Sequence, residues 1–367
     1  MRCVQRFVLI TLTTLFFCFP GHTVLTMAEE KVPDSEQSYF LTAETASKHR
    51  WSFSHLSSSK LLAQAETGTA GSDTEAGTSE AKEAAKIAEA LANPLSYLWL
   101  MFTQNDTAWY DGDILDRLGE DTKVMNTTLI MPVLSIQLTE KWKTIFRPVI
   151  PINSFDTVDN LNVSVDNVGE STIIGAEFDR KTGMGDIVLW TAFSKQYKPP
   201  SVFGFGPTVM MNTATDDRLG TGKWSAGPMA LAFSITDKWI LGGIAQHWWS
   251  FAGDDTQNVD SNLGPITVDR PDVNLTDFQY VIRYRLSPLT NIGAAPNVRY
   301  NWETEQLNLP VGIGFDTLVK IGRLPVKVGA ELHYYVEKSD DFGPEFMLRL
   351  FFVPVLPSPS WARTPLF

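Results

Sequence analysis

Apolar and polar residues alternate along much of the second half of the chain. In residues 325–337, Val326, Leu332 and Tyr334 lie among apolar positions on one face of an extended segment, while Lys327 and Glu331 lie among polar positions on the other. A period of two predicts β-strands with one apolar and one polar face. The same alternation recurs at 278–286, 292–303, 307–316 and 346–352.

Earlier segments carry apolar residues on both faces and are separated by turn-rich stretches. These segments are 128–138, 142–152, 183–194, 202–213, 223–235 and 238–252, and a first strand is expected near 95–103. The total of about twelve strands, each longer than the usual five or six residues, favours an all-β fold, namely a closed antiparallel transmembrane β-barrel, over a soluble sandwich. The two longest gaps, at 155–182 and 253–272, are predicted to be extracellular loops rich in Asp, Asn and Gly.

The N-terminal part has a different composition. Arg2 and Arg6 precede an apolar run at 7–19, which predicts a signal peptide over 1–28 and export to the bacterial outer membrane. Residues 29–79 are polar and of low complexity, so we expect them to be disordered, and the Ala- and Glu-rich segment 80–93 is expected to form a short helix. The barrel is then predicted over 94–356, followed by a C-terminal tail at 357–367.

Composition narrows the possible functions. A formal charge of −12 without a run of Lys and Arg argues against a nucleic-acid partner. Both cysteines, Cys3 and Cys18, lie in the predicted signal peptide, so a mature chain would contain no thiol, and we expect no cofactor or metal. The 22 Phe and 11 Trp fit either a large core or aromatic girdles at two lipid–water interfaces.

The faces of the predicted strands identify two sets of candidate site residues. The polar faces would line a lumen, and rings of charge in a pore bias which solutes pass. The alternative is that these side chains pair with one another and plug a narrow barrel. The lumen set is Arg283, Arg285, Arg299, Glu303, Asp316, Lys327, Glu331, His333, Glu337 and Arg349. The aromatic girdle set is Trp239, Trp248, Trp249, Tyr284, Tyr300, Trp302 and Tyr334.

Three other motifs admit a chemical interpretation that we consider weaker than a structural one. The run Gly220–Lys223 lacks the spacing and the following helix of a phosphate loop. His247 and Ser250 would point to opposite faces of a strand, which works against a hydrolase pair. The acidic loop at 254–260 fits no EF-hand pattern, although its carboxylates could bind calcium.

Several stretches between 93 and 355 resemble a bacterial outer-membrane barrel family linked by name to the MetA pathway of phenol degradation, whose members are often mislabelled as neuromedin U. The stretches include Gly183-Met184-Gly185-Asp186, Thr213-Ala214-Thr215-Asp216-Asp217, Gly220-Thr221-Gly222-Lys223-Trp224, His247-Trp248-Trp249-Ser250-Phe251 and Tyr300-Asn301-Trp302-Glu303. The resemblance implies a transporter-like barrel and brings no catalytic residues. The polar N-terminal extension and the Pro-rich tail depart from the family pattern.

Together, these observations predict a channel in contact with the lipid bilayer that passes small solutes by passive diffusion. The family resemblance implies that hydrophobic or aromatic solutes are among them. Two alternatives stay open at this point. One is a plugged barrel with a structural or surface-interaction role, and the other is a membrane-embedded hydrolase.

Overall fold

The computed structural model describes residues 74–93, 96–165, 171–195 and 200–367. The predicted signal peptide and residues 29–73 of the predicted disordered segment lie outside this part. Helix α2 begins at Thr74, six residues before the predicted start at 80, because the Ala- and Glu-rich composition already begins there. No helix in the described ranges combines the length and the apolarity needed to cross a membrane.

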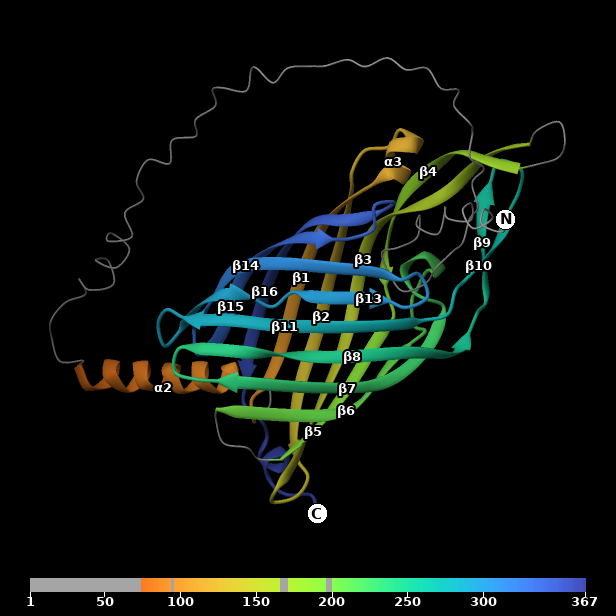
Figure 1. Ribbon diagram of the computed structural model, residues 1–367. Coiled ribbons are helices and arrows are strands. Elements are labelled where there is room, and N and C mark those ends of the chain that lie inside the picture. The colour runs from red at the N-terminus through yellow and green to blue at the C-terminus, as the bar shows by residue number, and fades with distance from the viewer. Residues whose placement is uncertain (1–73, 94–95, 166–170, 196–199) are drawn as a thin grey trace, which may run out of the picture. The chain divides into compact units, whose positions relative to one another are not determined.

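The described residues contain sixteen strands and four helical segments, two α-helical and two 3₁₀-helical (Figure 1). The helical segments are α2 (Thr74–Ala92), α3 (Asp113–Leu118), η1 (Asp217–Leu219) and η2 (Ser360–Arg363). The strands are β1 (Trp99–Asp111), β2 (Lys123–Gln137), β3 (Trp142–Val165), β4 (Ser171–Met184), β5 (Ile187–Lys195), β6 (Ser201–Met211), β7 (Lys223–Ile235), β8 (Trp239–Gly253), β9 (Thr256–Ser261), β10 (Ile266–Asp269), β11 (Asn274–Arg285), β12 (Thr290–Ala294), β13 (Asn297–Asn301), β14 (Gln306–Ile321), β15 (Leu324–Glu337) and β16 (Gly343–Leu356).

These strands close into a barrel. Strand β1 pairs with β16 and β3 pairs with β5, so the antiparallel ladder runs around a complete ring. Strands β4 and β5 form one barrel strand and β12 and β13 form another, while the β9–β10 hairpin stands outside the ring. The wall therefore has twelve strands, which confirms the predicted closed antiparallel barrel.

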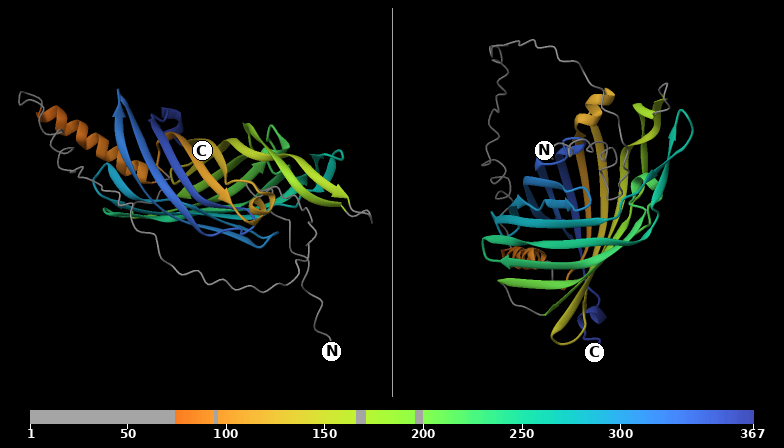
Figure 2. Two further views of the ribbon diagram at one scale, coloured as in Figure 1. Left: turned by 90° about the horizontal axis from the view of Figure 1, so that it is seen from above. Right: turned by 45° about the vertical axis from the view of Figure 1, so that its right-hand side comes forward.

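The predicted long loops at 155–182 and 253–272 are wrong in their secondary structure. Strands β3 and β4 continue as a paired hairpin well beyond the wall, and β9 and β10 form a second hairpin that touches β3 (Figure 2). Their Asp, Asn and Gly residues led to the loop prediction. The two hairpins nevertheless pack on each other through a small apolar core, which contains Val158, Leu161, Val163, Ala176, Val259 and Val268. Short turns lie at the other end of the barrel, which is the periplasmic end in outer-membrane barrels.

Ion pairs tie the β3–β4 hairpin to the loop after β6. Asp159 lies 3.0 Å from the Lys181 ammonium and 2.9 Å from the Arg218 guanidinium. The hydrogen bond from Lys181, and then the one from Arg218, hold the pKa of Asp159 below its ordinary value. The ionised form of Asp159 therefore stabilises the hairpin.

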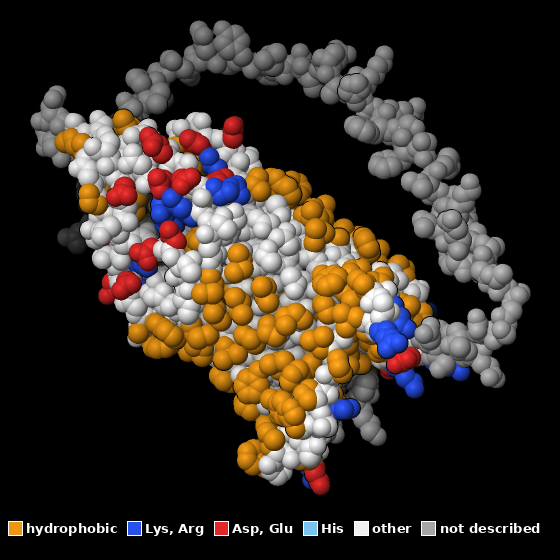
Figure 3. Space-filling model, turned by 180° about the vertical axis from the view of Figure 1, so that it is seen from behind, with side chains coloured by type: hydrophobic (Ala, Val, Ile, Leu, Met, Phe, Trp, Pro, Cys, Tyr) orange, Lys and Arg blue, Asp and Glu red, His pale blue; other side chains and the backbone are white. Residues whose placement is uncertain are grey.

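Exposure along the strands is reversed relative to a soluble sandwich. Ile313 is 63% exposed on the outer face, whereas Glu331, the partner on β15 of the next residue Gly314, is 1% exposed. Figure 3 shows a broad area of hydrophobic side chains on the face that it views, with acidic and basic side chains gathered beyond both ends of this area. Hydrocarbon is the solvent that such an area requires, since an apolar surface of this size is rarely exposed to water.

One barrel strand is interrupted in the middle of the wall. Strand β12 pairs with β14 from Thr290 to Ile292, where the pairing stops, and it resumes in β13 at Arg299. Gly293 has φ +139°, and a Cβ there would lie 2.0 Å from the Ile282 carbonyl oxygen. Pro296 has no N–H to donate to a ladder. The intervening residues are buried, and they supply backbone groups to the interior.

Candidate functional site

The barrel interior contains a cluster of buried charges contributed by β11, β14, β15, β16 and β1. Arg283 on β11 forms ion pairs with both Asp316 on β14 and Glu331 on β15. The ammonium of Lys327 lies 3.0 Å from Asp316, and Asn291 donates a hydrogen bond of 2.7 Å to the same carboxylate. Side chains from four successive strands of the wall, β11, β12, β14 and β15, are thus joined on one side of the interior.

Glu331 also joins this cluster to the interrupted barrel strand. Its carboxylate accepts a hydrogen bond of 3.0 Å from the Ala295 backbone N–H and lies 2.9 Å from His333 Nε2. Arg349 donates to the Ala295 carbonyl oxygen at 2.8 Å and pairs with Asp106 on β1 at 2.9 Å. The break between β12 and β13 therefore turns the backbone N–H and carbonyl of Ala295 inward, where they form hydrogen bonds with charged side chains.

Charges within the cluster balance. Three cations, Arg283, Lys327 and Arg349, face three carboxylates. Those carboxylates are Asp106, Asp316 and Glu331. Desolvation of buried ions is offset only when each has a partner, so the arrangement is stable as a set and sensitive to the loss of any member.

Gly312 makes room for the buried histidine of this cluster. A Cβ at Gly312 would lie 2.6 Å from His333 Cδ2 and 3.1 Å from the Cβ of Ala294. His333 is fully buried, so its ring cannot move aside without disturbing its neighbours. Glycine at this position lets β14 approach both the histidine and the interrupted strand.

The opposite wall of the interior is apolar. The inward side chains of β3 and β5–β8 form one cluster of buried hydrophobic residues, which are Ile145, Trp190, Ala192, Val202, Met229, Leu231, Phe233, Ile235, Ile240 and Ile244. Arg147 on β3 interrupts this wall, and its guanidinium lies 5.3 Å from the Trp190 ring centroid and 5.6 Å from that of Phe102. The interior therefore has two chemically different sides.

The end with the long loops is filled by a second group of apolar side chains. Tyr110 stacks on Phe342 with ring centroids 5.3 Å apart. Leu115 of α3, Phe155 of β3 and Leu219 of η1 are buried in the same cluster. Loop residues thus pack over this end of the interior.

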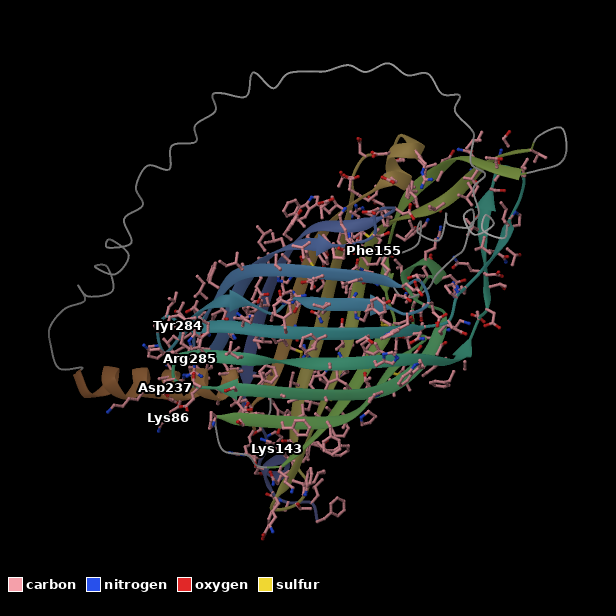
Figure 4. The ribbon with its side chains drawn as sticks, viewed as in Figure 1. Lys86, Lys143, Phe155, Asp237, Tyr284 and Arg285 are labelled. Atoms are coloured by element: carbon pink, nitrogen blue, oxygen red, sulfur yellow. The ribbon has the colours of Figure 1, made fainter. Side chains whose placement is uncertain are left out.

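A cavity of about 690 Å³ lies at the end with the short turns. Its described lining includes Lys143 on β3, Asp237 in the β7–β8 turn and Arg285 on β11, together with Lys86 of α2. Figure 4 shows Lys86, Asp237 and Arg285 near one another at this end, with Phe155 at the other end of the barrel. This volume is within the range of small-molecule binding sites.

The structure brings together six of the ten predicted lumen residues. Arg283, Asp316, Lys327, Glu331, His333 and Arg349 form the charged cluster. Arg299 pairs separately with Asp277 at 2.9 Å, and its side chain is 47% exposed. Arg285 lines the cavity at the short-turn end.

Glu303 and Glu337 do not join these residues. Glu303 is exposed in the turn between β13 and β14, and Glu337 is the exposed last residue of β15. Both share the period of the inward positions, but they lie where the wall ends. Alternation gives the face of a residue and not its height along the barrel axis.

The predicted girdle residues point outward with one exception. Trp239 packs edge-on against Tyr284 at the short-turn end, and Tyr300 packs edge-on against Trp302 at the long-loop end. Trp249 and Tyr334 are also exposed on the outer face. The assignment of Trp248 is wrong: it is 4% exposed and its indole N–H donates to Thr208 at 3.1 Å inside the barrel.

Sequence reasoning missed Asp106, Asp277, Ala295 and Arg147. The predicted first strand ended at 103, so Asp106 lay outside it, and Arg147 belongs to a segment that is apolar on both faces. Nothing in the local pattern of Ala295 signals a backbone ligand. A proline beside two alanines in an otherwise alternating segment was the available sign of an interrupted strand.

The Gly220–Lys223 motif is a structural turn in this fold. Asp186, between β4 and β5, accepts hydrogen bonds from the backbone N–H groups of Thr213, Ala214 and Thr221 at 3.1, 3.2 and 2.6 Å. Lys223 pairs with Asp255 at 2.5 Å. These groups are therefore occupied within the protein and do not form a phosphate cradle.

The hydrolase motif is not assembled. His247 Nδ1 lies 2.7 Å from Thr276 Oγ1, while the Ser250 hydroxyl donates to Asp272 at 2.9 Å. The His247 ring lies 4.0 Å from the Trp249 ring on the outer face. Among the described residues, no group of three or more His, Cys, Asp or Glu side chains is arranged to hold a metal ion.

Comparisons with known proteins support the fold. No family model matches the sequence, and no curated protein matches it either. A crystal structure of an outer membrane channel from Pseudomonas putida F1 is similar with a TM-score of 0.50 and 14% identity, covering 71% of this chain and 95% of that one. That channel belongs to the family that the sequence motifs resemble.

Two further structures are similar at lower scores. The CymD monoaromatic hydrocarbon channel gives a TM-score of 0.40 at 10% identity, covering 75% of this chain and 92% of that one. A mutant of the TodX monoaromatic hydrocarbon channel gives 0.39 at 10% identity, covering 72% and 92%. At 14% identity, the likeness to the Pseudomonas putida channel shows the fold alone. The chain has the fold of a bacterial outer-membrane β-barrel, as its sequence predicted.

Proposed function

We propose that this protein is a passive outer-membrane channel for small, partly apolar solutes. The observation that carries the proposal is the two-sided interior, in which a neutral cluster of ion pairs faces a wall of buried aliphatic and aromatic side chains. A solute with an aromatic or aliphatic body and one polar group can contact both sides at once.

The closed charge cluster lies in the path that a solute would take through this channel. The ion pairs and the apolar group at the long-loop end occupy much of the interior, so a solute passes only if side chains there rearrange. The same residues support the second candidate, a plugged barrel with a structural role. We prefer the channel because a cavity with both charged and apolar lining residues lies at the short-turn end, where a filled cylinder would leave none.

Enzymatic function is not part of the proposal. His247 and Ser250 have different hydrogen-bond partners, and a serine nucleophile is activated only by a base within hydrogen-bond reach. Measuring fatty-acid release from phospholipid vesicles by the purified protein tests this point. Release that disappears in a His247→Ala variant would reverse it.

Liposome swelling separates the channel from the plugged barrel. Proteoliposomes are transferred into iso-osmotic phenylalanine, leucine or the trisaccharide raffinose, and the swelling rate is followed by light scattering. The proposal predicts swelling in phenylalanine that exceeds swelling in leucine, and none in raffinose. Absence of swelling in every solute, from protein that is folded by gel mobility, would instead establish the plugged barrel.

A further inference from the structure

We propose that the cavity at the short-turn end is a binding site for small aromatic carboxylates. This inference deepens the proposed channel function and rests on it only for its biological purpose, because binding can be measured without transport. Nothing in the fold comparison or in the family resemblance assigns a ligand to this cavity.

An unpartnered guanidinium nitrogen is the first observation behind the proposal. Arg285 lines the cavity, and its Nη2 atom is buried without a hydrogen-bond partner among the described residues, so a ligand in the cavity reaches this atom once the side chain turns toward it. A buried charged donor without an acceptor costs free energy, so the site favours a ligand that supplies one. The planar guanidinium matches the two oxygens of a carboxylate.

The charge of the lining gives the sign of the ligand. Four cationic side chains and two carboxylates are found among the described residues around the cavity, a balance of +2. The cations are Lys86, Lys143, Arg285 and Arg363, and the carboxylates are Glu89 and Asp237. The central cluster is neutral, so the cavity is where an anionic solute is distinguished from a cationic one.

Apolar and aromatic groups next to these cations explain the preference for an aromatic acid over a bare anion. The Lys143 ammonium lies 4.6 Å from the Tyr97 ring centroid, and both residues line the cavity. Ile235 lines the cavity as well and belongs to the apolar wall. A ring can therefore lie on the apolar wall while its carboxylate meets Arg285.

Arg147 offers a second position of the same chemistry deeper in the interior, beyond the lining of the cavity. It lies on the same face of β3 as Lys143, four residues further on, which is about 13 Å along an extended strand. Its Nε atom is also buried without a hydrogen-bond partner, and two aromatic rings flank its guanidinium. Arg285 and Arg147 are five barrel strands apart in a ring of twelve, so they face the interior from nearly opposite sides.

The test measures binding of three probes of equal size to the full-length protein in detergent. Benzoate, benzamide and benzylamine differ in charge and share a ring, and saturation-transfer NMR with titration gives their dissociation constants. Acetate and inorganic phosphate serve as anions without a ring. We expect benzoate to bind roughly tenfold more tightly than benzamide, or better, because only its carboxylate supplies a charged acceptor for the Arg285 guanidinium. Benzylamine should bind most weakly, because its ammonium is repelled by the cationic lining.

Substitution of Arg285 locates the site. We expect Arg285→Gln to weaken benzoate binding by roughly tenfold or more and benzamide binding by less, and Arg285→Lys to restore part of the difference. The matched control is Arg323→Gln, in an exposed turn at the same end of the barrel, which should bind benzoate like the unmodified protein. Gel mobility of each variant confirms that it is folded.

Three results would overturn the inference. They are equal affinity for benzoate and benzamide, equal loss in the Arg285→Gln and Arg323→Gln variants, and binding of acetate or phosphate as tight as that of benzoate, which would make this a general anion site. Failure of the channel proposal is a separate result: a protein that binds benzoate through Arg285 but shows no swelling activity is a plugged barrel with an aromatic-acid site.

Discussion

Replacing Glu331 with leucine removes the carboxylate that connects three groups in the interior. Arg283, His333 and the Ala295 N–H all lose an acceptor. The side chain of Glu331 is only 1% exposed, so water does not replace it freely. The cluster changes from three cations against three carboxylates to three against two.

The expected cost follows from the unpaired charge. Breaking a buried ion pair by removing one partner destabilises a protein by about 3–5 kcal/mol, because the remaining charge stays desolvated. Urea titration of tryptophan fluorescence in detergent micelles, together with the gel mobility of the folded form, measures this loss. Glu303→Gln, in an exposed turn, is the control and should change the free energy of unfolding by about 0.5 kcal/mol or less.

A double-mutant cycle separates pairing from general disturbance of the interior. Arg283→Met alone leaves two carboxylates short of a partner, whereas Arg283→Met with Glu331→Leu removes one charge of each sign. We expect the double variant to be less destabilised than the sum of the two single variants by about 1–3 kcal/mol. Additive losses, or a Glu331→Leu loss as small as that of the Glu303 control, would mean that the charges are hydrated individually and do not form a cooperative cluster.

Three further predictions concern other parts of the fold. Gly312→Ala places a methyl group against the ring of the buried histidine and should cost about 1–3 kcal/mol in the same urea assay, whereas Gly175→Ala meets only ordinary contacts; equal effects would refute the close packing. Asp186→Ala leaves backbone N–H groups of the loop after β6 without their acceptor, so trypsin should cleave that loop faster at unchanged barrel stability, and an unchanged cleavage rate would contradict its role. The lowered pKa of Asp159 means that its contribution is present above the unfolded pKa of about 3.9 and is lost as the pH falls through the lower folded value. The ratio of the pepsin cleavage rate of the β3–β4 hairpin in the unmodified protein to that in Asp159→Asn should therefore rise below about pH 4, because the variant has already lost this contribution; a ratio that does not change with pH would contradict the assignment.

The sequence predicted the wall of the barrel well where its two faces meet different surroundings. Strand β15 has hydrocarbon on one side and buried charges on the other, so alternation at Lys327, Glu331 and Leu332 gave both the strand and its orientation. Strands β3 and β5–β8 have an apolar inner wall, so the contrast between their faces disappears. This is also why Trp248 was assigned to the outer surface.

Contacts between side chains on strands that are far apart in the sequence could not be predicted from local pattern. The partners Arg349 and Asp106 are 243 residues apart, and their contact depends on ring closure between β1 and β16. The inward backbone groups of Ala295 depend on an interruption that a single glycine and a single proline produce. The sequence determines which side chains face inward, whereas three-dimensional closure determines which of them meet.

Single-channel recording of the purified protein in a planar lipid bilayer tests the central claim most directly. A twelve-stranded barrel with a solute path through a neutral, two-sided interior predicts discrete current steps, and these steps should become larger or more frequent in Glu331→Gln, which loosens the cluster. A quiet bilayer containing protein that is folded and inserted, with no steps from either the unmodified chain or this variant, would contradict the account.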